Sequence, residues 1–298
     1  MQHTTVLRDE AVTGLALTPE SIVVDATFGA GGHSHAIRKV LGPTGRLIAV
    51  DKDPTAIRSA SFPPDGAAVD LVNDSFSNLR QILRSLHIDS VDAVLADLGW
   101  RSEQFADGAR GFSFQESGPL LMTYGDPTTY PFTAYDIVNE WDEKVLADII
   151  YGYGEDRLAR RIARSIVTSR ATAPIETTTE LAAIIVEAYP AQLRHGRIHP
   201  ATKTFQALRI AVNDELGVLE EFITEAVASL TPSGRLAIIT FHSLEDRIVK
   251  HRFRELRDAG VLDLVNKRPI TPTPEEVAQN PRARSAKLRI SSKVLSET

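Results

Sequence analysis

The chain has 298 residues, of which 43% are hydrophobic and 24% charged, a composition that supports the buried core of a globular protein. It contains no cysteine, which excludes disulfides, thiolate metal ligands and cysteine nucleophiles and suits a reducing compartment. The net charge of −6 disfavours a polyanionic partner, but basic residues gather at 157–209 and again at 282–293, and local fields matter more than the total.

Short, β-branched, nearly continuous apolar runs alternate with amphipathic stretches in the first third of the chain. Four runs predict strands, at residues 21–26, 46–51, 67–72 and 91–97. Three stretches predict helices, at residues 33–40, 54–60 and 76–86. This alternation predicts βαβ units and therefore a mostly parallel, doubly wound α/β sheet covered on both faces.

The alternation stops at residues 107–131, where Gly, Ser, Thr, Pro and aromatic residues predict a long functional loop. Helical patterns follow at 136–151, 155–169, 178–188 and 201–229. A strand is predicted at 235–240, a helix at 244–259 and a last strand at 286–292. We therefore expect a Rossmann-like domain made of residues 1–106 and 200–298, with a mostly helical domain inserted at 107–199.

A glycine-rich turn follows the first predicted strand, in the sequence VVDATFGAGGH at 23–33. Gly29, Gly31 and Gly32 allow positive φ angles and let a ligand approach the backbone closely. The second strand ends in Asp51, twenty residues after Gly31, where a carboxylate can accept both hydroxyls of a ribose.

This pattern suits either a nicotinamide dinucleotide or S-adenosylmethionine. Ser34 stands where the dinucleotide fingerprint has Gly or Ala, and Asp25 suits the cationic methionine end of S-adenosylmethionine. That cofactor has an amino group and a sulfonium cation but no phosphate, so a nearby acid helps its binding, and the pattern favours it over NAD.

Two further residues fall at predicted strand ends. Asp97 ends the fourth strand and can bind the cofactor or accept a proton from a substrate amine, although a turn cap is the alternative. Phe76 follows the third strand and can cover an adenine or belong to the core.

Read in order, HTTVLRDEAV, DATFGAGGHS, AVDKDP, RGFSF, HPATKTFQALRIAVNDEL, FHSLEDRIVK and NPRARSAKLR resemble the bacterial ribosomal RNA small subunit methyltransferase H family over residues 3–289. The resemblance implies a class I S-adenosylmethionine methyltransferase that modifies N4 of a cytidine in the decoding centre of 16S ribosomal RNA, with the small ribosomal subunit as partner. The cofactor positions that it implies are Gly31, Gly32, His33, Asp51, Phe76, Asp97 and Gln104.

The chain departs from this family in two loops. Trp100-Arg101-Ser102 replaces a small residue and two serines, and in GPLLMTYGD at 118–126 Leu121 and Thr123 replace an acid and an arginine. These changes leave an alternative function possible, that of an RNA-binding ribosome-assembly factor that binds the cofactor but has impaired catalysis. A small-molecule methyltransferase is another alternative, although it would need no basic patches.

Further candidates border the predicted crevice. Trp100 can stack on a flipped base or anchor its loop. His242 follows the fifth strand and can face the crevice, while Ser243 and Asp246 resemble a helix capping box. His33 and His35 have no partners at metal-ligand spacing, so we expect no metal.

Arg157, Arg161 and Arg164 fall on one face of a predicted helix, with Arg160 beside them. They are candidate RNA phosphate contacts, and a solvated face is the alternative. The charged residues Arg8–Glu10 interrupt any apolar signal, and no apolar run approaches the ~20 residues that span a bilayer. We expect a cytoplasmic protein with no membrane contact, and the oligomeric state stays open.

Overall fold

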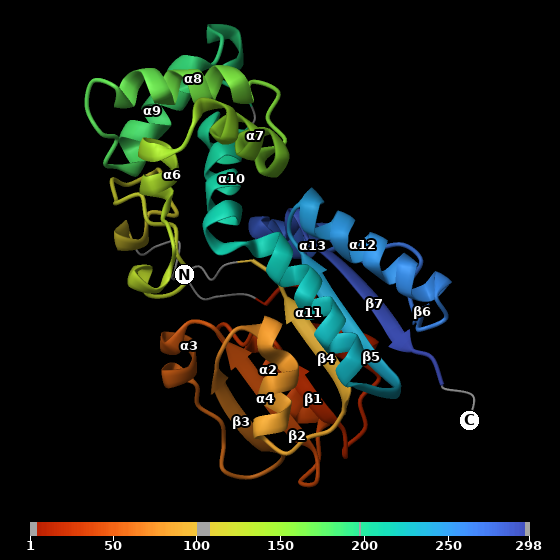
Figure 1. Ribbon diagram of the computed structural model, residues 1–298. Helices are drawn as coiled ribbons and strands as arrows, with labels where there is room; N and C mark the ends of the chain where they lie inside the picture. Colours follow the sequence, from red (N-terminus) through yellow and green to blue (C-terminus); the bar gives the residue numbers. More distant parts are fainter. Residues whose placement is uncertain (1–4, 100–107, 197, 296–298) are drawn as a thin grey trace. The chain divides into compact units, whose positions relative to one another are not determined.

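The computed structural model describes residues 5–99, 108–196 and 198–295. The chain forms two compact units: Met1–Gly99 together with Leu216–Thr298, and Trp100–Glu215. The first unit holds the sheet and the second is helical (Figure 1).

A single sheet organises the first unit. Its strands are β1 (Ile22–Asp25), β2 (Arg46–Asp51), β3 (Ala68–Asn73), β4 (Val91–Asp97), β5 (Leu230–Thr240), β6 (Leu262–Leu264) and β7 (Lys287–Lys293). Within the described residues the order is β3-β2-β1-β4-β5-β7-β6, with β1 to β5 parallel and β7 antiparallel to both of its neighbours (Figure 1). The doubly wound, mostly parallel fold predicted from the sequence is confirmed.

This strand order determines where a ligand can bind. From β1 the chain builds β2 and β3 on one side, and it then returns to add β4 and β5 on the other side. The switch point therefore lies between β1 and β4, and the crevice outside the carboxyl ends of such strands is the usual ligand site of doubly wound sheets.

Helices cover both faces of this sheet because neighbouring strand residues point to opposite sides. The helical segments of this unit are α1 (Arg8–Gly14), α2 (Gly32–Val40), α3 (Pro54–Ser59), η1 (Phe76–Asn78), α4 (Leu79–Ser85), α11 (Glu215–Ser229), α12 (Ser243–Asp258), α13 (Pro274–Gln279) and η5 (Pro281–Ser285). Val24 and Ile48 share a buried cluster with residues of α4, α11 and α12, whereas Val23 and Leu47 share another with residues of α1 and α2. These two apolar layers hold the strand ends in fixed positions.

The second unit packs helices around its own apolar core. Its helical segments are η2 (Gly108–Arg110), η3 (Pro127–Thr129), α6 (Ala134–Glu140), α7 (Glu143–Gly154), α8 (Ala159–Arg170), α9 (Thr178–Ala188), η4 (Ala191–Leu193) and α10 (Ala201–Asn213). Phe205, Leu208 and Val212 of α10 lie in this core. The helical unit therefore extends to Glu215, beyond the boundary at residue 199 predicted from the sequence, because α10 completes its core.

Two predicted helices are each broken in the structure. The helix expected at 201–229 divides at Asp214, whose φ of 47° is left-handed and ends α10 before α11 begins. The helix expected at 136–151 divides into α6 and α7 at Trp141, which has an extended conformation. The short elements α1, β6 and α13 were not predicted, because each has too few residues to show a period.

The loop that departs from the family pattern, residues 118–126, is tightly held within the helical unit. Asn213 donates from Nδ2 to the carbonyl of Met122 at 2.7 Å and accepts from the N–H of Tyr124 at 3.0 Å. Thr123 is buried, and its hydroxyl donates to the carbonyl of Gly125 at 3.2 Å. The structure accommodates the substituted residues without leaving this loop unsupported.

Candidate active site at the carboxyl edge of the sheet

The turn between β1 and α2 is shaped by glycines at the switch point. Gly29 and Gly31 have φ angles of 56° and 79°, and Gly31 is the N-cap of α2. A Cβ on Gly31 would lie 2.9 Å from the ring of Phe28, so a side chain at this position would be both strained and crowded. The backbone can pass close to a ligand here because no side chain stands between them.

Asp51 ties this turn to the end of β2. Its Oδ2 accepts the N–H of Gly29 at 2.8 Å, and its Oδ1 accepts the N–H of Asp53 at 2.8 Å. A carboxylate has about four lone-pair positions and can accept several hydrogen bonds at once, which suits the two hydroxyls of a ribose. The structure thus places a fixed, half-buried acceptor beside the glycine turn, where the sequence predicts ribose binding.

Asp25 supports the same turn from inside the protein. Its side chain is fully buried, accepts the hydroxyl of Ser34 at 2.6 Å and accepts the N–H of Thr27 at 3.2 Å. Burial raises the pKa of Asp25 to about 6, although these hydrogen bonds oppose the rise. In the structure this carboxylate holds the turn through these hydrogen bonds, and its expected place near the methionine end of the cofactor stays a prediction.

This buried acid makes stability depend on pH. Because the pKa of Asp25 is raised from 3.8 to about 6, its stabilising contribution is complete below the lower value and disappears as the pH rises through the upper one. Relative to Asp25→Asn, the wild-type protein is expected to lose about 3 kcal/mol of unfolding free energy over that range. Urea unfolding of both proteins at intervals of pH tests this, and a difference that stays constant with pH would contradict it.

Asp97 lies at the end of β4, next to the switch point. Its N–H donates to Thr27 Oγ1 at 2.6 Å, which links β4 to the glycine turn, and its side chain is 18% exposed. Oδ2 lies 3.6 Å from Nδ1 of His33, a separation too long for a hydrogen bond. Oδ1 is buried and accepts no hydrogen bond within the described part of the chain.

Burial and the nearby carboxylates of Asp25 and Glu245 raise the pKa of Asp97 well above its ordinary value. A buried acceptor without a donor is costly, so its presence at the ligand edge points to a donor that arrives with a ligand or substrate. A raised pKa also makes the ionised carboxylate a stronger proton acceptor.

The other predicted cofactor positions have mixed surroundings. His33 is buried in the first turn of α2, and a Cβ on Gly32 would lie 1.7 Å from Thr5 Oγ1, so Gly32 makes room for the N-terminal segment. Phe76 packs edge-on against Phe222, with 4.9 Å between ring centroids, and belongs partly to the core. Gln104 and Trp100 lie outside the described residues.

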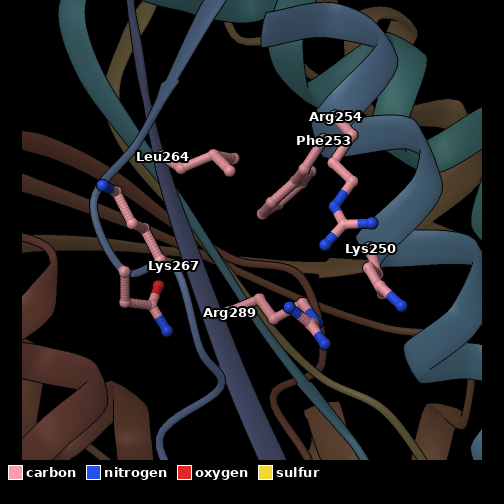
Figure 2. A pocket seen from close by; sticks show the side chains of 7 residues that line it. Lys250, Phe253, Arg254, Leu264, Lys267 and Arg289 are labelled. Carbon is pink, nitrogen blue, oxygen red and sulfur yellow. The ribbon is translucent and has the colours of Figure 1, made fainter.

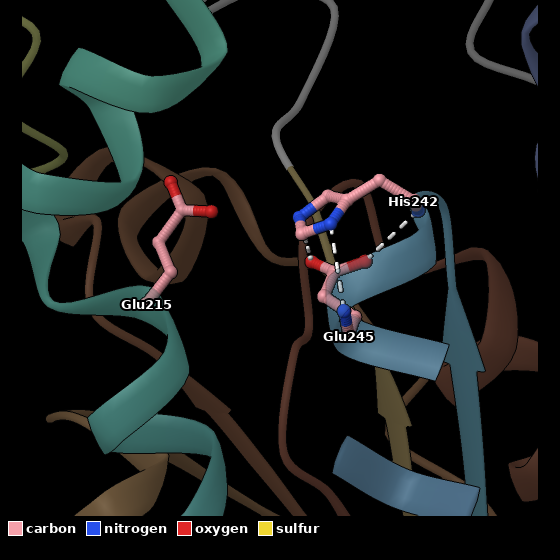
Figure 3. Close-up of side chains that lie close together, drawn as sticks. All are labelled: Glu215, His242 and Glu245. Carbon is pink, nitrogen blue, oxygen red and sulfur yellow. Dashed lines mark hydrogen bonds and ion pairs between the residues drawn. The ribbon is translucent and has the colours of Figure 1, made fainter. Parts of the chain in front are cut away.

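His242 caps α12 (Figure 3). Its Nδ1 accepts the N–H of Glu245 at 3.4 Å, while Glu245 Oε2 accepts the N–H of Phe241 at 2.8 Å and that of His242 at 3.3 Å. The capping box is therefore formed by His242 and Glu245, and the prediction that Ser243 and Asp246 form it is wrong. A catalytic role of His242 stays a prediction.

Several basic residues that the sequence offered as RNA contacts have acidic partners in the structure. Asp246 binds both Lys287, at 2.8 Å, and Arg289, at 2.7 Å, and these partners lower its pKa against the opposing effect of its burial. Arg209 forms a bidentate ion pair with Glu215, at 2.6 and 2.8 Å, within the helical unit. Sequence spacing held no sign of either pairing.

The four candidate RNA-binding arginines are exposed. Arg160, Arg161 and Arg164 lie on α8, whose opposite face is buried, whereas Arg157 precedes the helix. Arg164 lies 3.5 Å from Glu143 of α7, a partner distant in the sequence. Arg157, Arg160 and Arg161 form no ion pair with any other described residue.

A family model described as the MraW methylase family matches residues 1–294. The chain belongs to the MraW methylase family. This membership confirms the recognition made from the sequence, and with it a methyltransferase that uses S-adenosylmethionine. Within the described residues, no helix is both long enough and apolar enough to cross a membrane.

Relatives match over nearly the whole chain. A ribosomal RNA small subunit methyltransferase H from Brevibacillus brevis is 44% identical, over 98% of this chain and 98% of its own length. One from Koribacter versatilis is 47% identical, over 96% of this chain and 92% of its own. A solved rRNA methylase from Streptococcus thermophilus is 13% identical with a TM-score of 0.45, and the match covers 99% of this chain and 100% of that one.

Proposed function

We propose that this methyltransferase transfers a methyl group from S-adenosylmethionine to N4 of a cytidine in the decoding centre of 16S ribosomal RNA, in the cytoplasm. Full-length relatives named for ribosomal RNA support the RNA substrate. The sequence motifs that resemble that family support the N4 atom and the decoding centre. The observation that carries the chemistry is the buried Oδ1 of Asp97 at the switch point, which accepts no hydrogen bond from any residue that the structure describes.

The residues at this edge fit the cofactor. Asp51 offers acceptors for the ribose, and Gly29 and Gly31 leave space at the backbone. When bound, S-adenosylmethionine supplies an electrophilic methyl group on a sulfonium. The residues of the chain then align the amine with that group, because in-line transfer depends mainly on orientation.

Asp97 is the proposed acceptor for the substrate amine. The cytosine N4 lone pair is delocalised into the ring, so an acceptor on an N4–H bond returns electron density to nitrogen. As the new N–C bond forms, one proton must leave the amine, and an ionised Asp97 can take it and pass it to water. We also propose base stacking by Trp100, cofactor contact by Gln104 and substrate recognition by the helical unit.

The exposed arginines near α8 test the RNA-binding part of this proposal. Replacing Arg157, Arg160 and Arg161 with alanine is expected to lower the slope of log affinity against log salt by about 2, since each phosphate contact contributes about 0.7–0.9. Filter binding to small ribosomal subunits measures this slope. Arg80→Ala with Arg84→Ala on α4, both exposed, is the control and should leave the slope unchanged.

Single-turnover transfer from labelled cofactor separates this function from its alternatives. Incorporation into small ribosomal subunits that is not reduced by competing small metabolites supports an RNA methyltransferase. Cofactor binding and subunit binding without incorporation would instead support an assembly factor with impaired catalysis. Methyl transfer to a small molecule that is not reduced when ribosomal subunits are added would support a small-molecule methyltransferase.

A further inference from the structure

A shallow hollow on the first unit is lined by cations and lies among α12, β7 and the loop after β6 (Figure 2). Its volume is about 240 Å³, including the space open to solvent. The lining residues carry four positive groups and no acid: Lys250, Phe253, Arg254, Leu264, Asn266, Lys267 and Arg289. Phe253 and Leu264 belong to or pack against the apolar core behind it.

The positive charge of this hollow is incompletely neutralised. Arg289 is balanced by Asp246, which also binds Lys287. Lys250, Arg254 and Lys267 form no ion pair with any residue in 5–99, 108–196 or 198–295. Lys250 and Arg254 are four residues apart on α12 and therefore lie on the same helix face, where like charges repel.

The hollow is also held in shape. Asn266 Oδ1 accepts the N–H of Ile290 at 2.7 Å, and its Nδ2 donates to the carbonyl of Leu288 at 3.1 Å and to that of Arg268 at 2.8 Å. These bonds attach the loop that carries Lys267 to β7. The cations are thus presented on a fixed frame, which lowers the entropic cost of binding an anion.

We propose that this hollow is a second RNA contact, which binds a backbone phosphate of the ribosomal RNA substrate. The inference rests on the proposed function. The hollow is open to solvent and encloses very little space, so it suits contact with one exposed phosphate rather than enclosure of a whole nucleotide. An open site binds a single small anion weakly, whereas a polyanion adds this contact to others along its backbone.

The test compares two triple variants with the same change in charge. Lys250→Ala, Arg254→Ala and Lys267→Ala remove the uncompensated cations of the hollow. Arg252→Ala, Arg257→Ala and Arg268→Ala remove three others from the same helix and loop, of which Arg252 pairs with Glu255 and Arg257 with Asp258. Binding to small ribosomal subunits is measured over a range of salt, and thermal unfolding confirms that both variants are folded.

The hollow variant is expected to lower the slope of log affinity against log salt by about 2, and the control variant to keep the wild-type slope. Equal slopes in the two variants would overturn the inference. If both slopes are lowered, the effect of the substitutions is a general effect of charge, and if neither is lowered, the hollow makes no contact with phosphate. If the wild-type protein transfers methyl groups to subunits while the hollow variant binds like the control, the inference alone fails. If the wild-type protein neither binds nor methylates subunits, the proposed function fails with it.

Discussion

Asp97→Asn is expected to lower the single-turnover rate of methyl transfer by about 10²–10⁴-fold, the usual contribution of a positioned proton acceptor. Asparagine keeps the size of the side chain but cannot accept the proton that leaves the amine. In the wild-type protein the rate should fall as the pH is lowered through the raised pKa of Asp97, because protonation removes the acceptor. Rapid quenching with labelled cofactor across pH measures both effects.

The same substitution should stabilise the protein at neutral pH. It removes an acid whose ionised form is disfavoured by burial and by the carboxylates of Asp25 and Glu245, so the unfolding free energy should rise while activity falls. Asp92→Asn, at the other end of β4, is the matched control and should retain the transfer rate. An Asp97→Asn protein with the wild-type rate would show that this carboxylate is not the acceptor.

Asp51→Asn is expected to weaken binding of S-adenosylhomocysteine about 10- to 100-fold. Either orientation of the amide turns its NH₂ group toward the N–H of Gly29 or of Asp53, and it also removes a charged acceptor from the ribose site. A hydrogen bond to a charged group is worth about 1.5–3 kcal/mol, which gives this range. Isothermal titration calorimetry of the purified protein measures the affinity directly.

Asp70→Asn on the neighbouring strand β3 is the control for this experiment. Asp70 lies opposite Ile48 and forms an ion pair at 2.7 Å with Arg46, the first residue of β2, so the pair is away from the carboxyl ends and its loss should leave cofactor affinity unchanged. Equal affinities for wild type and Asp51→Asn would place the ribose elsewhere. Equal losses in both variants would indicate a general weakening of the sheet.

The sequence predicted the edge of the sheet well because the chemistry there is local. The glycine turn, Asp51 and Asp97 each follow a short apolar run, and parallel strands bring their ends together without further information. The supporting role of Asp25 was missed, because the hydrogen bond from Ser34 depends on how the first turn of α2 packs. Ser34 was noted in the sequence only as a departure from a dinucleotide pattern.

Features that depend on distant partners could not be predicted. Arg209 and Arg289 were counted among basic residues available to RNA, but they are paired with Glu215 and Asp246, and no spacing rule identifies such partners. The break at Asp214 was also missed, since a non-glycine residue with positive φ leaves little sign in the sequence. Asp214 ends α10, and α11 begins at the next residue, which is also the last residue of the helical unit.

Mass mapping of nucleosides in 16S ribosomal RNA, with and without this protein, tests the central claim most directly. Small subunits from cells that lack the protein should gain one N4-methylcytidine in the decoding centre when they are incubated with it and S-adenosylmethionine, and the Asp97→Asn protein should leave them unmodified. A methyl group on another atom or nucleotide, or none with the wild-type protein, would contradict the account.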